Sequence, residues 1–410
     1  MKPDLKNSRI MTWWNRRNSP KSDDSPDESP DKSDEAGKKG FITDFARQCA
    51  ENLEEFEEVE VKCGITGPSG SGKSSLINAI VNERIADVGV TETTNEPQDV
   101  RHGNVIFTDL PGIGTAKWPR ETYIERLNLA SYDVFLLITS GRFTENDLFL
   151  YQKLTEMGKP CLVVRNKFDI AVTNADFDHG HTEEQTREII TRNILENLAP
   201  SRPERIYLVS ARLPHLYDLD DLLSDIQEAL PGIKSQRFLM DSAAYSAKKL
   251  SEKRELLEKR LIWFTGTAAA NGAIPIPGID VFGDVAVMLK FADEVASSYG
   301  LKEDQLGRKQ RFLTSNTGQT LVTKAAQFTA SFLTKQGIKV LLKKTANKTV
   351  ARQAGKLVPI LGPAVGAVIG GSGTYLVGRQ MISEGETIAR EIMEEMSRSA
   401  TLESLTEKTT

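Results

Sequence analysis

The chain has few cysteines, little net charge and no N-terminal pattern of a secretion signal. These features disfavour a disulfide-rich protein, a nucleic-acid-binding protein and a secreted protein. The three cysteines, Cys49, Cys63 and Cys161, are scattered among apolar runs, so neither a disulfide framework nor a four-ligand zinc site is predicted. The 52 basic and 57 acidic residues leave a formal net charge of −5, which disfavours nucleic acid as a partner. Lys2 follows Met1 where N-myristoylation requires glycine. We therefore expect a cytoplasmic protein whose membrane attachment, if any, comes from elsewhere in the chain.

Composition and periodicity divide the chain into five segments. Residues 1–40 include a run of Ser, Pro, Asp and Lys without large apolar side chains, and we expect a disordered tail there. A helical pattern over 41–56 predicts a helix that packs with a later helical domain. Strand-like and helical patterns alternate over 57–235, whereas 236–400 shows long helical stretches only. A short tail, 401–410, completes the chain.

One segment of alternating apolar and polar residues and four short apolar runs predict the strands of the middle segment. They are Val59–Ile65, Val105–Phe107, Val134–Thr139, Cys161–Val164 and Ile206–Val209. Helix-length, charged segments separate most of them, and strands that alternate with helices form a mainly parallel sheet covered on both faces. The predicted fold class is therefore α/β, with a mainly parallel sheet, followed by an all-α domain.

The strongest motif is "GPSGSGKSS", which lies between an alternating strand and an apolar helix. This is the spacing of a phosphate-binding loop, in which glycines let backbone N–H groups turn towards the β-phosphate at a helix N-terminus. Lys73 would bridge the β- and γ-phosphates, and Ser74 would ligate Mg²⁺. The residues predicted to hold the phosphates are Gly67, Gly70, Ser71, Gly72, Lys73, Ser74 and Ser75.

A second motif, Asp109-Leu110-Pro111-Gly112, follows the strand-like run "NVIFT". The Asp109 carboxylate would hold Mg²⁺ through water, and the Gly112 N–H would meet the γ-phosphate. The next residue is Ile113, where many signalling GTPases carry a glutamine that positions the attacking water. The threonine expected to close over Mg²⁺ lies in "GVTETTNEP", where Thr91, Thr93 and Thr94 are all candidates.

Two further motifs predict which base is bound. Asn166-Lys167-Phe168-Asp169 ends another strand, and the Asp169 carboxylate can accept hydrogen bonds from N1 and the exocyclic amino group of guanine. Adenine cannot form that pair. Ser210-Ala211 follows the strand-like run "IYLV" and is expected to touch the base. Together the four motifs predict that 57–235 is a P-loop GTPase domain, with GTP and GDP as ligands and Mg²⁺ as the metal.

The motifs "GPSGSGKSSLINAI", "VTETTNE", "VIFTDLPGIGTAKWPRETYIERL" and "NGAIPIPGIDV" resemble the immunity-related GTPases, also called interferon-inducible GTPases. The similarity covers roughly residues 41–400. It implies dynamin-like behaviour: GTP-dependent self-assembly on intracellular membranes in cell-autonomous innate immunity. In the Glu-x-Thr switch pattern of that family, Thr94 would contact Mg²⁺, and Glu92 precedes it. The chain departs from the family in lacking the myristoylated glycine and in carrying Asn166 where Thr is common.

Hydrolysis without a glutamine after Gly112 needs another group to orient water. We expect a second copy of the chain to supply it, with Glu92 entering the shared interface. A different residue of the same molecule remains the alternative. The predicted catalytic residues are Lys73, Glu92, Thr94 and Gly112, and the predicted metal ligands are Ser74, Thr94 and Asp109.

Several segments are candidates for membrane contact. Leu261–Ile279 and Leu357–Gly378 carry no charge, but their prolines and glycines favour helices buried in a helical domain over membrane spans. The cations between Lys335 and Lys356, and the pair Trp13 and Trp14, suit either a lipid surface or ordinary solvent exposure.

Two other functions fit part of the sequence. RNA- or ribosome-associated GTPases also carry an apolar residue after Asp-x-x-Gly, but no basic RNA-binding module is recognisable here. A GTP-bound scaffold with negligible turnover would need only the binding motifs.

Overall fold

The computed structural model describes residues 32–86, 96–141, 143–199, 203–271, 281–309, 313–346 and 373–407. Chain contacts separate two units, Met1–Ile42 and Thr43–Thr410. The described residues of the first unit form the beginning of helix α2 (Lys32–Glu58). This helix starts nine residues before Phe41, where the sequence pattern placed its beginning.

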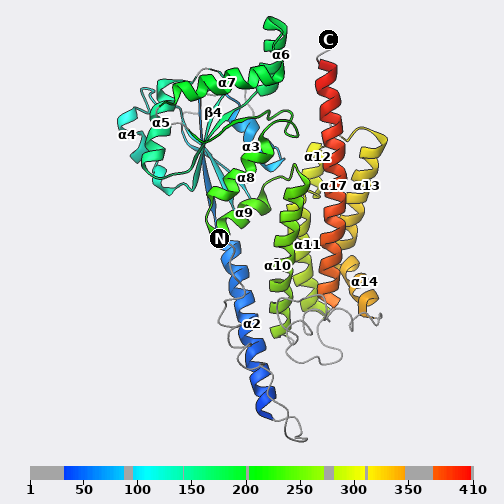
Figure 1. Cartoon of the computed structure of the whole chain (residues 1–410). Helices are drawn as coiled ribbons and strands as arrows, with labels where there is room; N and C mark the ends of the chain where they lie inside the picture. Colours follow the sequence, from blue (N-terminus) through cyan, green and yellow to red (C-terminus); the bar gives the residue numbers. More distant parts are fainter. Residues whose placement is uncertain are drawn as a thin grey trace, which may run out of the picture. The chain divides into compact units, whose positions relative to one another are not determined.

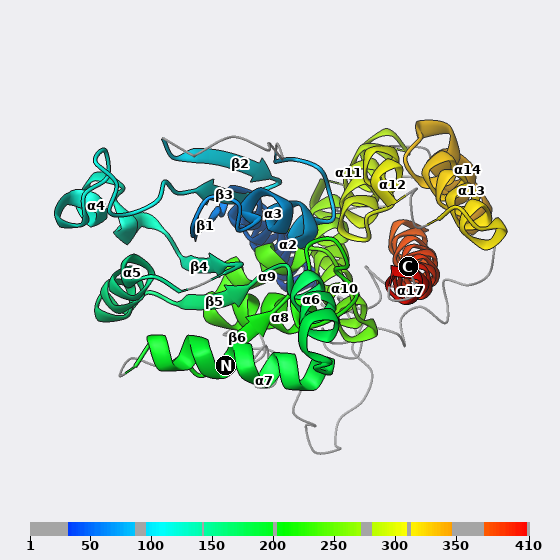
Figure 2. The ribbon, with the colours of Figure 1, turned by 90° about the horizontal axis from the view of Figure 1, so that it is seen from above.

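The second unit contains a six-stranded sheet. The strands are β1 (Val61–Thr66), β2 (Gln98–His102), β3 (Val105–Asp109), β4 (Val134–Thr139), β5 (Cys161–Arg165) and β6 (Ile206–Leu208). Their order across the sheet is β2-β3-β1-β4-β5-β6, as Figure 2 shows, and every neighbouring pair is parallel except β2 with β3. β1, β3 and β4 are buried almost throughout, as expected for strands covered on both faces.

Helices cover both faces of this sheet. On one face lie α3 (Lys73–Val81), α8 (Leu219–Ala229) and α9 (Gly232–Asp241), which share a core with inward side chains of β1, β3 and β4. The other face is covered by α4 (Arg120–Arg126), α5 (Glu145–Glu156), α6 (Phe168–His179) and α7 (Glu183–Asn197). A 3₁₀ turn, η2 (Leu129–Ser131), precedes β4.

The C-terminal half contains helices and no strand among its described residues. These are α10 (Ala247–Asn271), α11 (Val281–Ser298), α12 (Glu303–Lys309), α13 (Asn316–Phe332), α14 (Lys335–Ala346) and α17 (Gly373–Glu407). The long helix α17 packs against α10, α11, α13 and α14 (Figure 1). At its contact with α10, a Cβ on Gly378 would come within 2.2 Å of Leu261, so glycine permits the close approach.

The predicted fold class is confirmed by the mainly parallel sheet and the helical C-terminal half. The antiparallel edge strand β2 adds to the five strands that the sequence indicated. Parts of the two uncharged segments, 272–279 and 357–372, lie outside the described residues, as do the tail with Trp13 and Trp14. The domain boundaries at 56/57 and 235/236 stay predictions.

Buried charged side chains tie the end of α2 to the helices that follow the sheet. The ring of Phe56 is fully buried and lies close to two guanidinium groups, with Arg260 at 3.8 Å and Arg237 at 5.0 Å from its centroid. Arg260, which is itself buried, also forms an ion pair with the partly exposed Glu294 of α11. The 41–56 segment thus contacts α9 and α10, the first helix of the C-terminal half.

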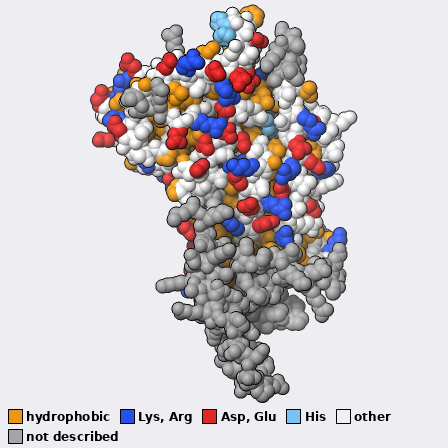
Figure 3. All heavy atoms as spheres, in the orientation of Figure 1, with side chains coloured by type: hydrophobic (Ala, Val, Ile, Leu, Met, Phe, Trp, Pro, Cys, Tyr) orange, Lys and Arg blue, Asp and Glu red, His pale blue; other side chains and the backbone are white. Residues whose placement is uncertain are grey.

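The face of the molecule drawn in Figure 3 shows no concentration of one charge among its described residues. In the face of Figure 3, basic and acidic side chains are interspersed over the described residues. This mixture agrees with the small net charge of the sequence.

Candidate functional site

The loop of residues 67–74, here called the phosphate loop, joins β1 to α3 and needs glycine at two positions. Gly67 has φ +144°, and a Cβ there would lie 2.0 Å from the Ile138 carbonyl oxygen. Gly72 has φ +86°, and a Cβ there would lie 2.4 Å from Nδ2 of Asn166. Any other residue would be strained and would clash, because both glycines combine positive φ with close packing. The backbone is thereby turned so that α3 begins directly at Lys73.

Two polar side chains of this loop are placed as a phosphate site requires. Lys73 folds back over the loop: its Nζ donates to the Gly67 carbonyl at 3.2 Å and lies 3.7 Å from Oδ1 of Asp109. The Ser71 hydroxyl is fully buried and has no hydrogen-bond partner among the described residues. A buried donor without a partner is costly, and a phosphate oxygen would satisfy it. The loop therefore fits a nucleotide phosphate.

The register of the sheet places Asp109 beside the phosphate loop. β1 and β3 are parallel with Ile65 opposite Asp109, so the carboxyl ends of both strands meet at the phosphate loop. Ser74 follows Lys73 in the first turn of α3. No group of three or more His, Cys, Asp or Glu side chains in the described ranges could hold a metal ion alone. A magnesium ion here would rely on Ser74, Asp109 and oxygens of the bound nucleotide.

The residue after Gly112 has a buried side chain. Ile113 is 7% exposed and belongs to an apolar cluster with Leu110, Trp118 and Tyr123. Its carbonyl oxygen accepts a hydrogen bond from Nδ2 of Asn146 at 3.0 Å, which holds the turn in place. Gly112 itself is exposed, with open space around its Cα. The Ile113 side chain therefore offers nothing to orient a water molecule.

Asn166 connects the base-reading segment to the phosphate loop. Its Nδ2 donates to the carbonyl oxygens of Ser71 at 3.0 Å and Gly72 at 3.2 Å, while its Oδ1 accepts from the Ala211 N–H at 3.1 Å. One buried side chain thus fixes three segments that are far apart in sequence. Lys167, the next residue, adopts φ +60° at the start of α6.

Asp169 stands in the first turn of α6 with its carboxylate nearly buried. Oδ2 accepts a hydrogen bond from Nε of Arg212 at 3.3 Å. Ser210 is fully buried, and its hydroxyl accepts from the Leu213 N–H at 3.1 Å, which closes a turn next to Ala211. The structure therefore brings Asn166, Asp169, Ser210 and Ala211 together.

Some predicted residues cannot be placed. Glu92, Thr91, Thr93 and Thr94 lie in 87–95, outside the described residues. The catalytic and metal roles assigned to Glu92 and Thr94 stay predictions.

Two residues of the site were missed from the sequence. Asn146 and Arg212 belong to no nucleotide-binding motif, and each acts on a residue more than thirty positions away. Only Arg212 could have been suspected from the sequence, because it follows the Ser210-Ala211 motif directly.

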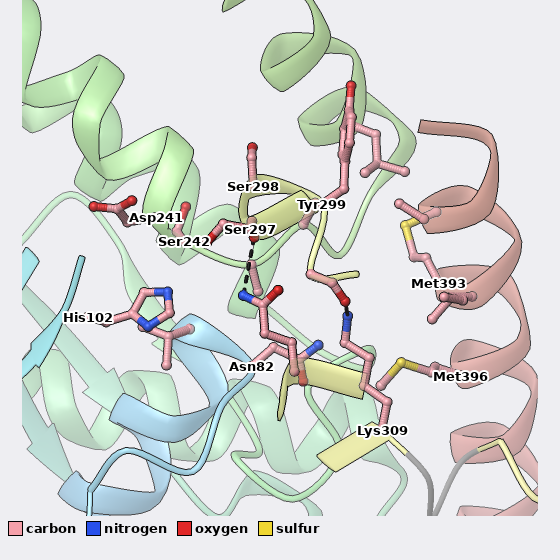
Figure 4. Close-up of a pocket in the computed structure, with 18 of the residues that line it drawn as sticks. Asn82, His102, Asp241, Ser242, Ser297, Ser298, Tyr299, Lys309, Met393 and Met396 are labelled. Carbon is pink, nitrogen blue, oxygen red and sulfur yellow. Dashed lines mark hydrogen bonds between the residues drawn. The ribbon is translucent and has the colours of Figure 1, made fainter. Parts of the chain in front are cut away.

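A small cavity lies at the opposite end of α3 from the phosphate loop. It has a volume of about 40 Å³, and Figure 4 shows Asn82, Lys309 and Met393 around it. This space holds a few water molecules and not a nucleotide. His215 lines the cavity with both ring nitrogens buried and without a hydrogen-bond partner among the described residues.

His215 should make the protein less stable in acid. Burial, followed by the nearby Lys309 ammonium, lowers the His215 pKa from 6.5 to about 4. The unfolded chain then binds the extra proton between these values, so stability falls as pH drops below 6.5. We expect wild type to lose about 2 kcal/mol more than His215→Gln between pH 7.5 and pH 5, measured by urea unfolding. Equal losses in both proteins would contradict this assignment.

The lengths and compositions of the helices bear on membrane insertion. Among the described ranges, none is both long and apolar enough to cross a bilayer.

Comparison with known proteins agrees with this geometry. Residues 28–355 match the family model described as interferon-inducible GTPase. Interferon-inducible GTPase 5 of Bos taurus is 30% identical over 285 residues, which are 67% of this chain and 61% of that protein. Interferon-inducible GTPase 1 of Mus musculus is 30% identical over 289 residues, or 67% of this chain and 69% of that protein. The match thus spans less than two thirds of the bovine relative.

Among solved structures, a probable GTP-binding protein engB is 20% identical and covers 41% of this chain and 98% of its own, with a TM-score of 0.30. Toc33 from Arabidopsis thaliana, in complex with Mg²⁺ and GMPPNP, is 15% identical and covers 42% of this chain and 78% of its own, with a TM-score of 0.29.

Proposed function

Because the chain belongs to the interferon-inducible GTPase family, we propose that it binds GTP with Mg²⁺ and hydrolyses it to GDP and phosphate. The observation that carries this proposal is the link between the phosphate loop and the base-reading segments. Asn166 donates hydrogen bonds to the phosphate loop and accepts one from the Ser210-Ala211 turn. A nucleotide whose phosphates lie in the loop therefore has its base beside Asp169. A carboxylate there selects guanine.

Each described side chain has a defined task in this reaction. Lys73, already folded over the loop, would neutralise the β- and γ-phosphate oxygens, and the Ser71 hydroxyl would donate to one of them. Ser74 and Asp109 would hold Mg²⁺, which supplies Lewis-acid stabilisation of the charge on the phosphates when bound. The exposed Gly112 N–H would meet the γ-phosphate.

The experiment that tests the proposal is phosphate release from GTP and from ATP, each with Mg²⁺ and with a chelator. We expect release from GTP with Mg²⁺ and little from the other three mixtures. Equal turnover of ATP and GTP would contradict the role of Asp169.

We further propose that a second copy of the chain completes the site. Ile113 is packed in the core, so the residue after Gly112 cannot orient water. An apolar surface is also available nearby: α6, which begins beside Asp169, exposes Phe177 at 90% and Ile170 at 51%. These residues are spaced seven apart and lie on one face of the helix, as a docking surface for another copy would require.

We propose that the protein acts at the surface of intracellular membranes. Helix α14 packs its buried Ile338 towards the other helices and exposes Lys335, Lys343 and Lys344, with Val340 57% exposed among them. A cationic helix face with an exposed apolar residue suits an anionic lipid surface. Lys339, also on α14, is partly buried, and the remaining cations of this stretch, Lys348, Arg352 and Lys356, lie outside the described residues.

Charge reversal on α14 tests this surface. Lys343→Glu with Lys344→Glu should weaken binding to phosphatidylserine vesicles by at least about 30-fold, because each cation near the surface contributes about 1 kcal/mol. Vesicle co-sedimentation measures the effect. The control reverses Lys153 and Lys248, two lysines exposed on other helices. If both double variants bind like wild type, α14 has no lipid role.

The family names of the mouse and bovine relatives support a role in interferon-induced defence of the cell. We propose this role for the present chain. A transcript that does not rise after interferon treatment would count against it.

A further inference from the structure

Arg212 contacts Asp169 of the base-reading segment, although it belongs to none of the four nucleotide-binding motifs. It follows Ala211 directly, and its Nε donates to Oδ2 of Asp169 across 43 residues of sequence. The two side chains differ in burial: Asp169 is 8% exposed and Arg212 is 42% exposed. The guanidinium group thus meets the carboxylate from the solvent side of the site.

The contact of Arg212 with Asp169 could stabilise the fold or could orient the Asp169 carboxylate, and the burial of the pair favours the second role. A partly exposed ion pair contributes little to folding, about 0–1 kcal/mol, so stabilising the fold is a poor reason for this contact. Orientation of the Asp169 carboxylate explains the contact better. The Asp169 carboxylate must be coplanar with the guanine edge to accept from N1 and from the exocyclic amino group at once. A donor fixed on Oδ2 restricts rotation of the carboxylate about its last torsion.

The position of Arg212 is itself constrained. The preceding residues are held by the Ser210 hydroxyl, which accepts from Leu213 N–H, and by Asn166, which accepts from Ala211 N–H. Further along, Asp218 accepts from the Leu208 N–H and from Arg187. The loop is therefore anchored on both sides of Arg212, and this geometry lets it act as a rigid support.

We propose that Arg212 is a positioning residue that holds the Asp169 carboxylate in the orientation that reads both donors of guanine. It acts through Asp169 and sets base selectivity. This inference rests on the proposed function, since it requires that Asp169 faces a guanine base.

The test compares GDP with inosine diphosphate, which lacks the exocyclic amino group, by calorimetric titration of the full chain with Mg²⁺. Wild type should bind GDP more tightly than inosine diphosphate. In Arg212→Ala, GDP binding should weaken by about 3- to 10-fold, because the carboxylate must now be ordered on binding. Inosine diphosphate should weaken less, so the selectivity ratio falls towards one.

Two variants identify the cause of such a change. Arg212→Lys keeps the charge but not the Nε donor, and should lose selectivity as Arg212→Ala does. Arg205→Ala removes a similarly exposed arginine that pairs with Asp221 and does not contact Asp169, and should bind both nucleotides like wild type. Thermal unfolding of the nucleotide-free proteins should change little in any of them.

The outcomes are distinct. An unchanged selectivity ratio in Arg212→Ala overturns the positioning role, whether both affinities are retained or both fall equally through loss of charge. If wild type binds ADP as well as GDP, the proposed guanine site itself is wrong, and the inference falls with it.

Discussion

Replacing Lys73 with alanine is expected to reduce GTP hydrolysis by about 100-fold or more. The ammonium group is the cation that the fold places over the phosphate loop, 3.2 Å from the Gly67 carbonyl and 3.7 Å from Asp109. Removing one preorganised donor from a site of developing negative charge costs about 10²–10³ in rate. Single-turnover phosphate release at saturating GTP measures this loss.

The control for Lys73 is Lys153→Ala, which removes a lysine exposed on α5. Its hydrolysis rate should match wild type. A Lys73→Ala protein that retains its rate within threefold would show that the phosphates lie elsewhere.

Asp169→Asn is expected to exchange the base that the protein selects. The carboxylate accepts two hydrogen bonds from guanine, whereas an amide offers one acceptor and one donor. Hydrogen bonds to a charged group contribute about 1.5–3 kcal/mol each, so GTP binding should weaken by about 100-fold. Xanthosine triphosphate carries a carbonyl in place of the exocyclic amino group, and its affinity should rise correspondingly.

Competition titrations with GTP and xanthosine triphosphate measure both changes. The rise for xanthosine triphosphate separates lost recognition from simple unfolding, because a damaged protein would bind neither nucleotide. Weakening towards GTP without any gain for xanthosine triphosphate would contradict direct reading of the base by Asp169.

The phosphate loop could be predicted from the sequence because its determinants are local. Gly67, Gly72 and Lys73 act within one strand–turn–helix unit, and the glycines are needed for backbone geometry that their spacing already indicates. The mainly parallel sheet followed from alternating strand and helix patterns in the same way.

What escaped prediction depends on contacts between distant segments or on weak patterns. Strand β2 reads "QDVRH", a polar edge strand whose side chains are mostly exposed, so it carries no hydrophobic signal. The contacts of Asn146 with Ile113 and of Arg212 with Asp169 join separate elements and leave no mark in local spacing. The early start of α2, at Lys32, lies in a segment whose composition favours disorder.

The burial of Ile113 gives the sequence-based hypothesis of a shared site its structural argument. An apolar residue after Gly112 could have lain beside the phosphates and excluded water there. Instead it is packed with Leu110, Trp118 and Tyr123, and the Tyr123 hydroxyl donates to the Pro111 carbonyl at 2.6 Å. The turn is thus fixed by its own core, and the group that orients water has to come from another segment or another copy.

Phosphate release per molecule across a hundredfold dilution series tests this account most directly. If a second copy completes the site, the specific activity at saturating GTP and Mg²⁺ rises with protein concentration. It levels off once nearly all molecules are in dimers. A specific activity that stays constant over the whole series would contradict the account and place the water-orienting group within a single molecule.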